Sequence, residues 1–428
     1  MPPPYTLSTT IRKSYKFRLY PTSGQTIRLQ SCLNAHRNLY NAALQERRDA
    51  YKHFKRYQDV EGKVKDKTNF FAQSVQLKDI RAFDPDGQGG WSASSQQATL
   101  RRLDKTFAAF FRRVKAAKPG VKVGYPRFKG AGWFDTIEWP KDRDGCRWDS
   151  QPHDKNLRVY LQGIGHVKVR AHRAVQGQIK TIQIKREGVG KNAKWFVILS
   201  CDNVPARDLG PARIGGPAGI DMGVKVFLAT HDGELIDNPR FVHTAQDKLA
   251  VAQQSLSRKK RGSNNRFKAQ RKVAAIHAKT KRQRTDFHHK TALKLLQDYD
   301  EIFHENLNIA GMTKSPKPKL DPDMPGGFLP NGAAAKAGLN KSILDAGWSA
   351  FLSILTAKAA NAGRLVDSVS AANTSRTCPL CGNCQAENRP TRDVFCCLGC
   401  GHTAHADVNA AINVLGRGLA SQTEPLLV

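Results

Sequence analysis

Apolar and basic residues alternate near the start of the chain, and the pattern then changes to a helical spacing. Residues 11–20 read Ile-Arg-Lys-Ser-Tyr-Lys-Phe-Arg-Leu-Tyr, a two-residue period that predicts a strand with one basic face. Thr22 has the position of a helix N-cap, because apolar residues recur at roughly helical spacing over residues 27–44. A second, strongly basic helix is expected at about 94–117. Residues 56–90 are polar and are interpreted as a connection that ends in a loop.

Beyond Pro119 the pattern predicts a series of short strands. Their apolar positions alternate with Lys and Arg, which favours a small β-barrel with a basic outer face. The strand at 11–20 is expected to belong to this barrel, so that the helical block is an insertion in it. Residues 205–217, rich in Pro and Gly, are interpreted as a linker. The expected barrel strands after Pro119 are 121–128, 157–161, 166–170, 179–185 and 195–199.

A third region, from residue 218, combines apolar strands with basic helices. Residues 218–229 predict a strand with one acid embedded in it, and Asp232-Gly233 predicts the turn of a hairpin. The further elements expected are a strand at 301–308, a loop at 314–338, a helix at 342–363 and a strand at 366–369.

The segment between the first two of these strands, residues 247–298, has a helical pattern, is very basic and is broken at 261–265. One interpretation is a solvated pair of helices. The other is contact with nucleic acid, which the charge of the whole chain favours. The candidate contact residues are Arg258, Lys259, Lys260, Arg261, Arg271, Lys272, Lys281, Arg282 and Arg284.

Composition narrows the class of partner. Lys and Arg outnumber Asp and Glu by 69 to 36, and the formal net charge of +33 favours a polyanion, above all nucleic acid. A membrane is the poorer alternative, because no apolar run approaches the ~20 residues of a spanning helix. The first residues, Met-Pro-Pro-Pro-Tyr, lack the apolar core of a signal peptide. We therefore expect a cytoplasmic protein without membrane association.

The cysteines indicate a metal site. Six of the nine lie between residues 378 and 400, a pattern typical of metal binding in a reducing compartment rather than of a disulfide framework. Two Cys-x-x-Cys pairs at this separation can close a tetrahedral thiolate shell around one structural Zn²⁺ ion. Cys384 and Cys396 are interpreted as cysteines that do not bind the metal ion. A ligand set that uses Cys396 in place of Cys397 stays open. The expected ligands are Cys378, Cys381, Cys397 and Cys400.

Three acids have unusual positions. Asp221 lies within an apolar strand, Glu305 lies near the end of another, and Asp407 opens an apolar helix. Taken singly, they can be a turn partner, a surface acid and a helix N-cap. Taken together in a basic protein, they are typical of carboxylates that hold paired Mg²⁺ ions for phosphodiester hydrolysis, because hard oxygen ligands suit magnesium.

The segments around these acids resemble the RuvC-type nuclease motifs of the TnpB family, which are transposon-encoded, RNA-guided nucleases related to type V CRISPR effectors. The three segments are Gly-Ile-Asp221-Met-Gly, His-Glu305-Asn-Leu-Asn-Ile-Ala-Gly-Met312 and Asp407-Val-Asn-Ala-Ala-Ile-Asn413. Further matching segments are Phe17-Arg-Leu-Tyr-Pro21 with Gln25, Tyr125-Pro-Arg-Phe-Lys129, Lys336-Ala-Gly-Leu-Asn-Lys-Ser-Ile-Leu-Asp-Ala-Gly-Trp348 and Thr-Ser375-Arg-Thr-Cys-Pro-Leu-Cys-Gly382. The resemblance covers nearly the whole chain in the family's order.

The resemblance implies an α/β multidomain protein. Its RNase H-like (RuvC) nuclease domain would carry an inserted zinc ribbon, and its small β-barrel would be interrupted by a helical recognition lobe. Asp221, Glu305 and Asp407 would be catalytic ligands of two Mg²⁺ ions, and one structural Zn²⁺ would hold the ribbon. The implied boundaries are 1–21 and 119–210 for the barrel (wedge), 22–118 for the recognition lobe, 211–372 and 403–428 for the nuclease domain, and 373–402 for the ribbon.

The implied activity is RNA-guided cleavage of double-stranded DNA beside a short motif, in a prokaryotic cytoplasm and in association with the nucleoid. The guide would be a transposon-end RNA or, in the alternative of a compact type V CRISPR effector, a CRISPR RNA. A cleavage-dead repressor is disfavoured because all three acids are present, and a transposase is disfavoured by the ribbon directly before the third acid. One departure is His405-Ala406, where many relatives have Asp-Arg, so a nearby acid or arginine is missing.

Overall fold

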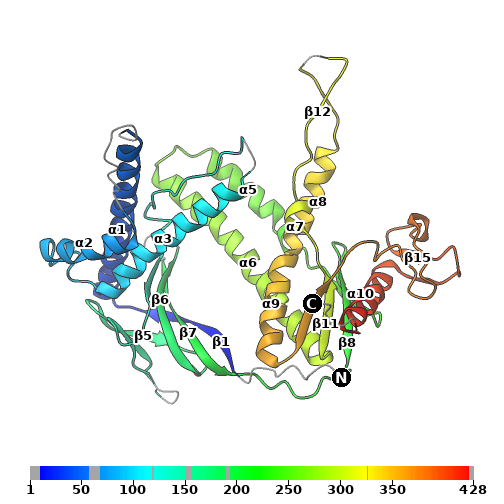
Figure 1. Ribbon diagram of the computed structural model, residues 1–428, viewed down its shortest axis with the longest axis horizontal. Helices are drawn as coiled ribbons and strands as arrows, with labels where there is room; N and C mark the ends of the chain where they lie inside the picture. Colours follow the sequence, from blue (N-terminus) through cyan, green and yellow to red (C-terminus); the bar gives the residue numbers. More distant parts are fainter. Residues whose placement is uncertain are drawn as a thin grey trace. The chain divides into compact units, whose positions relative to one another are not determined.

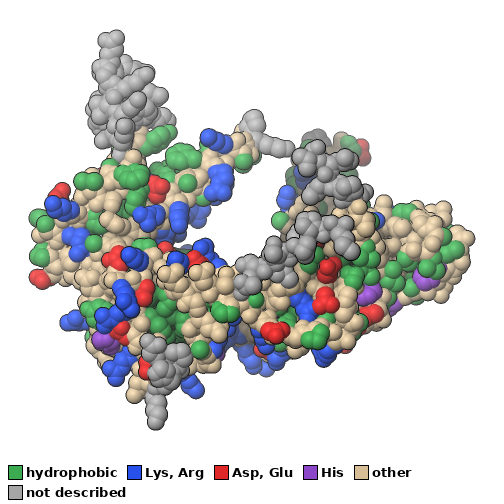
Figure 2. All heavy atoms as spheres, turned by 60° about the horizontal axis from the view of Figure 1, so that its bottom comes forward, with side chains coloured by type: hydrophobic (Ala, Val, Ile, Leu, Met, Phe, Trp, Pro, Cys, Tyr) green, Lys and Arg blue, Asp and Glu red, His purple; other side chains and the backbone are tan. Residues whose placement is uncertain are grey.

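The computed structural model describes residues 10–56, 68–117, 120–150, 154, 156–188, 193–324 and 326–423. The chain divides into two compact units, an amino-terminal one within Thr9–Pro205 and a carboxyl-terminal one that contains Ala206–Val428. Lys and Arg side chains lie over both units on the face that Figure 2 shows. Among the described residues, no helix is both long and apolar enough to span a membrane.

The amino-terminal unit is built on a seven-stranded sheet. Its strands are β1 (Thr10–Tyr20), β2 (Thr136–Trp139), β3 (Cys146–Trp148), β4 (Arg158–Leu161), β5 (Gly165–Arg170), β6 (Gln178–Glu187) and β7 (Lys194–Pro205). The order is β2-β6-β7-β1-β5-β4-β3, and every pair is antiparallel (Figure 1). The prediction that the first strand joins the later ones is confirmed, because β1 lies between β7 and β5.

Three helices connect β1 to the rest of the sheet: α1 (Ser23–Arg56), α2 (Phe70–Phe83) and α3 (Ala93–Ala116). The predicted N-cap is confirmed: the Thr22 hydroxyl accepts from the Gln25 N–H and the Gln25 side chain accepts from the Thr22 N–H, which is a capping box. The sequence interpretation missed α2, which lies within the polar residues 56–90. This helix buries only Gln73 and Leu77, so it shows almost no apolar periodicity.

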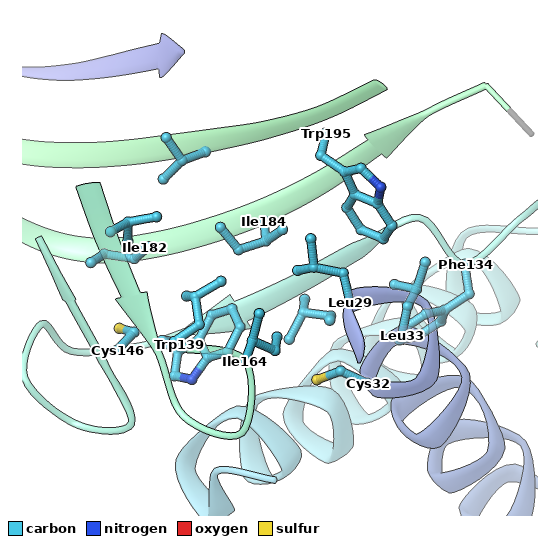
Figure 3. Packing of buried hydrophobic residues seen from close by; sticks show 14 of the residues in the cluster. Leu29, Cys32, Leu33, Phe134, Trp139, Cys146, Ile164, Ile182, Ile184 and Trp195 are labelled. Carbon is cyan, nitrogen blue, oxygen red and sulfur yellow. The ribbon is translucent and has the colours of Figure 1, made fainter. Parts of the chain in front are cut away.

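One face of this sheet packs against α1 and α3 and forms the core of the unit (Figure 3). Leu29 and Leu33 of α1 point from the helix toward the strand that carries Trp195. Trp139 of β2 and Cys146 of β3 belong to the same buried cluster, although β2 and β3 are the two edges of the sheet. The sheet therefore curves until its edges share one core, which is a nearly closed form of the expected barrel.

One predicted barrel strand is wrong. Residues 121–128 belong to no strand, and β2 and β3 supply the additional strands instead. Gly124 and Pro126 account for the difference, because proline has no backbone N–H to donate to a ladder and glycine weakens a strand. β2 and β3 are too short to give a recognisable alternation.

The carboxyl-terminal unit contains a five-stranded sheet of mixed direction. Its strands are β8 (Pro217–Met222), β9 (Val226–Thr230), β10 (Leu235–Asp237), β11 (Glu301–Glu305) and β14 (Leu365–Val369). The order is β10-β9-β8-β11-β14, in which β8, β9 and β10 are antiparallel neighbours and β11 runs parallel to both β8 and β14. The single strand expected at 218–229 is thus two strands of a hairpin. Two further hairpins are formed by β12 (Lys319–Leu320) with β13 (Phe328–Leu329) and by β15 (Val394–Cys396) with β16 (Thr403–His405).

Helices α6 (Asn264–Asp298) and α9 (Trp348–Ala362) pack on one face of this sheet, and α10 (Ala406–Thr423) packs on the other. The described residues of this unit also form α4 (Phe241–Thr244), α5 (Gln246–Ser257), α7 (Ile309–Met312) and α8 (Ala333–Ala346), with a short 3₁₀ turn at Ala386–Asn388. The helix expected at 342–363 is two helices, because Gly347 has a φ of 70° and both ends α8 and begins α9.

The two faces of the sheet can be told apart by alternation along β8 and β11. Ile220 and Ile302 lie in the core that α6 and α9 cover. Phe303, by contrast, belongs to a cluster with Val414 of α10. At Gly219 the backbone of α10 comes so close that a Cβ would lie 2.1 Å from the Ala411 carbonyl oxygen. The residues two positions further along each strand therefore share the face toward α10.

Candidate functional site

The three predicted acids converge at one end of the sheet, on the face toward α10. Asp221 follows Gly219 by two residues on β8, and Glu305 follows Phe303 by two residues on β11. Asp407 lies in the first turn of α10. A Cβ on Gly223, just beyond β8, would be 3.7 Å from the Asp407 carboxylate. Strand pairing thus brings together acids that are distant in the sequence.

The electrostatics of this cluster are unfavourable without a cation. Burial, and then the negative charges of Glu305 and Asp407, raise the pKa of Asp221 to about 8. Burial also raises the pKa of Glu305. Like-charged carboxylates that share a partly buried site favour a bound divalent metal, which removes the repulsion. The donor set, three carboxylates, fits a hard ion such as Mg²⁺.

A residue that the sequence analysis missed lies beside these acids. Arg389, in the loop between the two cysteine pairs, is 3.3 Å from Asp407 through its Nη2 and Oδ1 atoms. Its charge also lowers the pKa of Asp221. An arginine thus lies beside Asp407 although the preceding His405-Ala406 contains none. The available signal was an arginine within a ribbon that leads directly into the third acid.

Hydrogen bonds from α10 hold the segment that precedes the cysteines. Asn413 donates through Nδ2 to the Thr374 and Thr377 carbonyl oxygens, at 2.8 and 2.7 Å, and Asn409 donates to the Thr377 carbonyl at 3.0 Å. The Thr374 hydroxyl in turn donates to Glu305. One chain of contacts thus joins the helix that carries Asp407 to the carboxylate of Glu305.

The four predicted cysteines form a single cluster. The sulfurs of Cys378, Cys381, Cys397 and Cys400 all lie within 4.8 Å of one another. The Cys378–Cys400 and Cys381–Cys397 sulfurs are 3.6 and 3.5 Å apart, close to the ~3.8 Å between ligands of a tetrahedral zinc with bonds of ~2.3 Å. Cys384 and Cys396 lie outside the cluster, so the geometry favours the register with Cys397.

Backbone geometry prepares this cluster for a metal ion. Gly382 and Gly401, each directly after a Cys-x-x-Cys pair, have φ values of 75° and 74°, which a residue with a side chain rarely adopts. The turns direct amide groups toward sulfur, and the Cys400 N–H lowers the pKa of Cys397 to about 7. Zinc binds cysteine in its thiolate form, so the two Cys-x-x-Cys turns fit a closed structural zinc site.

The basic residues predicted to contact nucleic acid lie in the turn after α5, at 258–261, and on α6. The break expected at 261–265 separates the two helices. All but one of the candidates are exposed. The exception is Arg284, which donates to the carbonyl oxygens of Leu344 and Asp345 at the end of α8, at 3.0 and 3.1 Å. Its guanidinium is engaged with another helix, whereas the other candidates are exposed, and among these Arg282 donates through Nε to the Ala278 carbonyl oxygen of its own helix at 2.9 Å.

Comparison with known families gives three matches along the chain. Residues 206–316 match a model described as "Probable transposase", and residues 348–414 match one described as "Cas12f1-like, TNB domain". Residues 9–56 match a model described as "Helix-turn-helix domain". In this structure residues 10–56 form one strand and one helix.

Two relatives align over almost the full length. One, from Escherichia coli (strain K12), is named "Putative RNA-guided DNA endonuclease InsQ"; it is 28% identical, and the alignment covers 95% of this chain and 92% of the relative. A protein of Streptomyces pristinaespiralis, named "Putative RNA-guided DNA endonuclease", is 29% identical over 96% of this chain and 90% of its own length.

Solved structures share the fold at low sequence identity. A Cas12f1 chain, from a complex with guide RNA and target DNA, gives a TM-score of 0.51 at 15% identity and covers 95% of this chain and 99% of its own. The RNA-guided endonuclease CRISPR-Cas_phi3 gives 0.51 at 10% identity, covering 98% and 93%. These likenesses concern the arrangement of elements.

Proposed function

The chain belongs to the TnpB family, and on this premise we propose that it is an RNA-guided, Mg²⁺-dependent DNA endonuclease. The observation that carries the proposal is the convergence of Asp221, Glu305 and Asp407 on one face of the β8–β11 pair, where burial and then the charges of Glu305 and Asp407 raise the pKa of Asp221 to about 8. The full-length relatives that are named RNA-guided DNA endonucleases support the same activity.

The fold assigned to this centre is RNase H-like, of the RuvC type. Its support is the sheet order β10-β9-β8-β11-β14, with three antiparallel strands continued by two parallel ones and α10 packed across β8 and β11. In this assignment the zinc ribbon at 373–402 is an insert, and the seven-stranded sheet with its helical insertion forms the wedge and the recognition lobe. The nuclease domain would then comprise 211–372 and 403–428.

In the proposed mechanism each acid has a separate local environment. Two Mg²⁺ ions, when bound, activate a water molecule and stabilise the leaving oxygen of the phosphodiester. Asp221, Glu305 and Asp407 would together hold the ions. Glu305 is oriented by the Thr374 hydroxyl, and Asp407 is balanced by Arg389. The residues thus keep the carboxylates in place and limit their repulsion until the metal ions bind.

The remaining assignments follow from the same premise. One Zn²⁺ would be bound by the four cysteines as a structural ion, because a four-thiolate shell leaves no open position for substrate. The partners would be a guide RNA and double-stranded DNA, with the exposed cations of α6 and of the turn before it on the phosphate backbones. Guide pairing would read the sequence, so these cations need only recognise backbone shape.

The test begins with the RNA that co-purifies when the protein is expressed with its native flanking DNA. We expect a discrete RNA with a constant scaffold and a variable 3′ segment. The purified complex should then cut a plasmid that matches this segment, and this cutting should require Mg²⁺. A 3′ segment that maps to a transposon flank favours the transposon nuclease, and one that maps to a spacer array favours the CRISPR effector. Only heterogeneous RNA that salt removes, without guided cutting, contradicts the proposal.

A further inference from the structure

The connection between α3 and β2 has a structure that the proposed nuclease activity does not explain. We call residues 120–134 the strap (Figure 1). It contains the Tyr125-Pro-Arg-Phe-Lys129 segment and was expected to be a strand. From residue 121 to 128 its backbone makes no hydrogen bond to a strand in the described part of the chain. The segment is therefore held in place by something other than a β-ladder.

Contacts at several points hold the strap in place. The side-chain amide of Asn41 on α1 donates to the Lys129 carbonyl at 3.0 Å and accepts from the Lys129 N–H at 2.8 Å, so it replaces a strand partner at one residue. Arg186 of β6 donates to a strap carbonyl two residues further on. Pro126 and Phe134 are buried. The strap is thus fixed to the unit along its length.

The side chains between these anchors are aromatic and exposed. Trp133 is 84% exposed, Phe128 44% and Tyr125 36%, and Tyr51 on the adjoining α1 is 60% exposed. The Trp133 indole lies beside Gly130, where a Cβ would be 3.7 Å from the ring. Single exposed aromatic residues are common on protein surfaces. Several on one anchored segment indicate a ligand with flat faces.

Cations accompany these rings, and acids are absent from the strap. The Arg48 guanidinium carbon is 5.1 Å from the Phe128 ring centroid, and its charge also acts on the Tyr125 hydroxyl. Lys122 and Arg127 are exposed. The sequence from residue 120 to residue 134 contains no Asp or Glu. The ligand is therefore expected to combine flat apolar rings with negative charge.

From this combination we propose that the strap binds unpaired nucleotides, with bases stacked on Trp133 and Phe128 and phosphates beside Arg48 and Arg127. Nucleobases in a duplex are stacked on each other, so only unpaired nucleotides offer their faces to aromatic side chains. An apolar protein partner would account for the rings but not for the cations. The source of these nucleotides rests on the proposed function: they would belong to an unpaired part of the guide RNA or to one strand of opened DNA.

Photo-cross-linking tests where unpaired nucleotides lie. The full chain is purified with its RNA in two arms. In the first arm the RNA contains 4-thiouridine. In the second arm the complex receives guide-matched DNA that carries 4-thiothymidine in an unpaired bubble. We expect zero-length cross-links to peptides that contain Phe128 or Trp133 in at least one arm, and the arm identifies the source. Mass spectrometry that finds cross-links elsewhere in the chain, and none in the strap in either arm, overturns the proposal.

An affinity measurement tests stacking. At about 0.3 M salt, where phosphate contacts are weakened, the Trp133→Ala/Phe128→Ala variant should bind a fluorescein-labelled 12-nucleotide single strand about tenfold more weakly than wild type, in line with the typical effect of a stacked base. Phe83→Ala, which removes an exposed aromatic ring (93%) on α2, is the matched control and should bind like wild type. Equal binding by wild type and the double variant contradicts stacking.

Neither readout requires DNA cleavage. Asp221→Asn should therefore keep the strap cross-link. If guided cutting failed, the cross-link would still be expected. Conversely, guided cutting without any strap cross-link would remove this inference and leave the proposed nuclease intact. Trp133→Phe should restore most of the affinity that Trp133→Ala loses, because a smaller ring still stacks. A loss that Trp133→Phe does not restore would mean that the indole only supports the local fold.

Discussion

The two units each bury a polar cluster, and the clusters differ in whether their charges are balanced. In the amino-terminal unit His36 is fully buried, with Nδ1 2.8 Å from the Cys32 carbonyl oxygen and Nε2 2.8 Å from the Ser95 hydroxyl. Burial lowers its pKa to about 4, so the imidazole is neutral and both nitrogens are satisfied. In the carboxyl-terminal unit, Asp221 and Glu305 repel each other, and burial raises the pKa of both.

This difference separates a structural cluster from a functional one. A buried polar group that has all its hydrogen-bond partners contributes to a unique packing and needs no ligand to be stable. Buried like charges are costly for the fold alone and indicate a missing cation. The contrast predicts that changes in the two clusters have opposite consequences. Loss of an acid should remove activity and spare stability, whereas a charge on His36 should reduce stability.

The largest expected effect is that of Asp221→Asn. The amide keeps the size of the carboxylate but cannot bind Mg²⁺ as strongly, so guided cleavage should fall by roughly a thousandfold or more. The thermal midpoint measured without added Mg²⁺ should not fall, because the variant removes repulsion with Glu305 and Asp407. The matched control is Glu301→Gln, at the other end of β11, which should cut like wild type. Cleavage near the wild-type rate by Asp221→Asn would contradict the assigned centre.

The thiol cluster offers a second contrast, because a zinc ion bound there would hold structure and take no part in chemistry. Cys378→Ser should lose bound zinc, measured per chain by atomic emission. Cleavage should fall by up to about a hundredfold, because the ribbon positions Arg389 and Thr374 beside the acids. Cys384→Ser, outside the cluster, should keep its zinc and its activity. Zinc loss by Cys384→Ser with retention by Cys378→Ser would exclude this ligand set.

A smaller effect is expected from Thr374→Val. The substitution keeps the shape of the side chain and removes the hydroxyl that donates to Glu305. We expect cleavage to fall about tenfold and the Mg²⁺ concentration for half-maximal rate to rise, since a positioning contact to a ligand is lost. Thr377→Val is the control, because its hydroxyl donates to the Asn373 carbonyl and contacts no acid. An unchanged Mg²⁺ dependence would show that Glu305 needs no such support.

The cysteine cluster and the acidic cluster also differ in how far the sequence could predict them. The cysteine cluster follows from ligand spacing within a short segment, so its four members could be named in advance. The acids could be named from resemblance and from their placement in apolar elements, but not their common face, which depends on the parallel pairing of β8 with β11. Arg389 was missed because its contact with Asp407 depends on how the ribbon folds. The strap was misread as a strand because an anchored segment without strand partners has the same local pattern as a paired one.

The smallest and most specific effect concerns His36 and pH. An unfolded chain takes up a proton on this histidine near pH 6.5, whereas the folded unit does so only near pH 4. Between these values the unfolded state binds more protons, so stability falls as the pH falls, by up to about 1.4 kcal/mol per pH unit. The contribution is complete above pH 6.5 and is lost progressively below it.

The test is the thermal midpoint of wild type and of His36→Gln at pH 7.5 and at pH 5. Other histidines titrate in the same range, so the informative quantity is the difference between the two proteins. We expect wild type to exceed the variant at pH 7.5 and this advantage to shrink at pH 5. His172→Gln, which alters an exposed histidine in the same unit, is the control for the substitution itself and is measured at both pH values. A constant difference for His36→Gln would mean that folding does not lower the pKa of His36, and the contrast between a balanced and an unbalanced cluster would then fail.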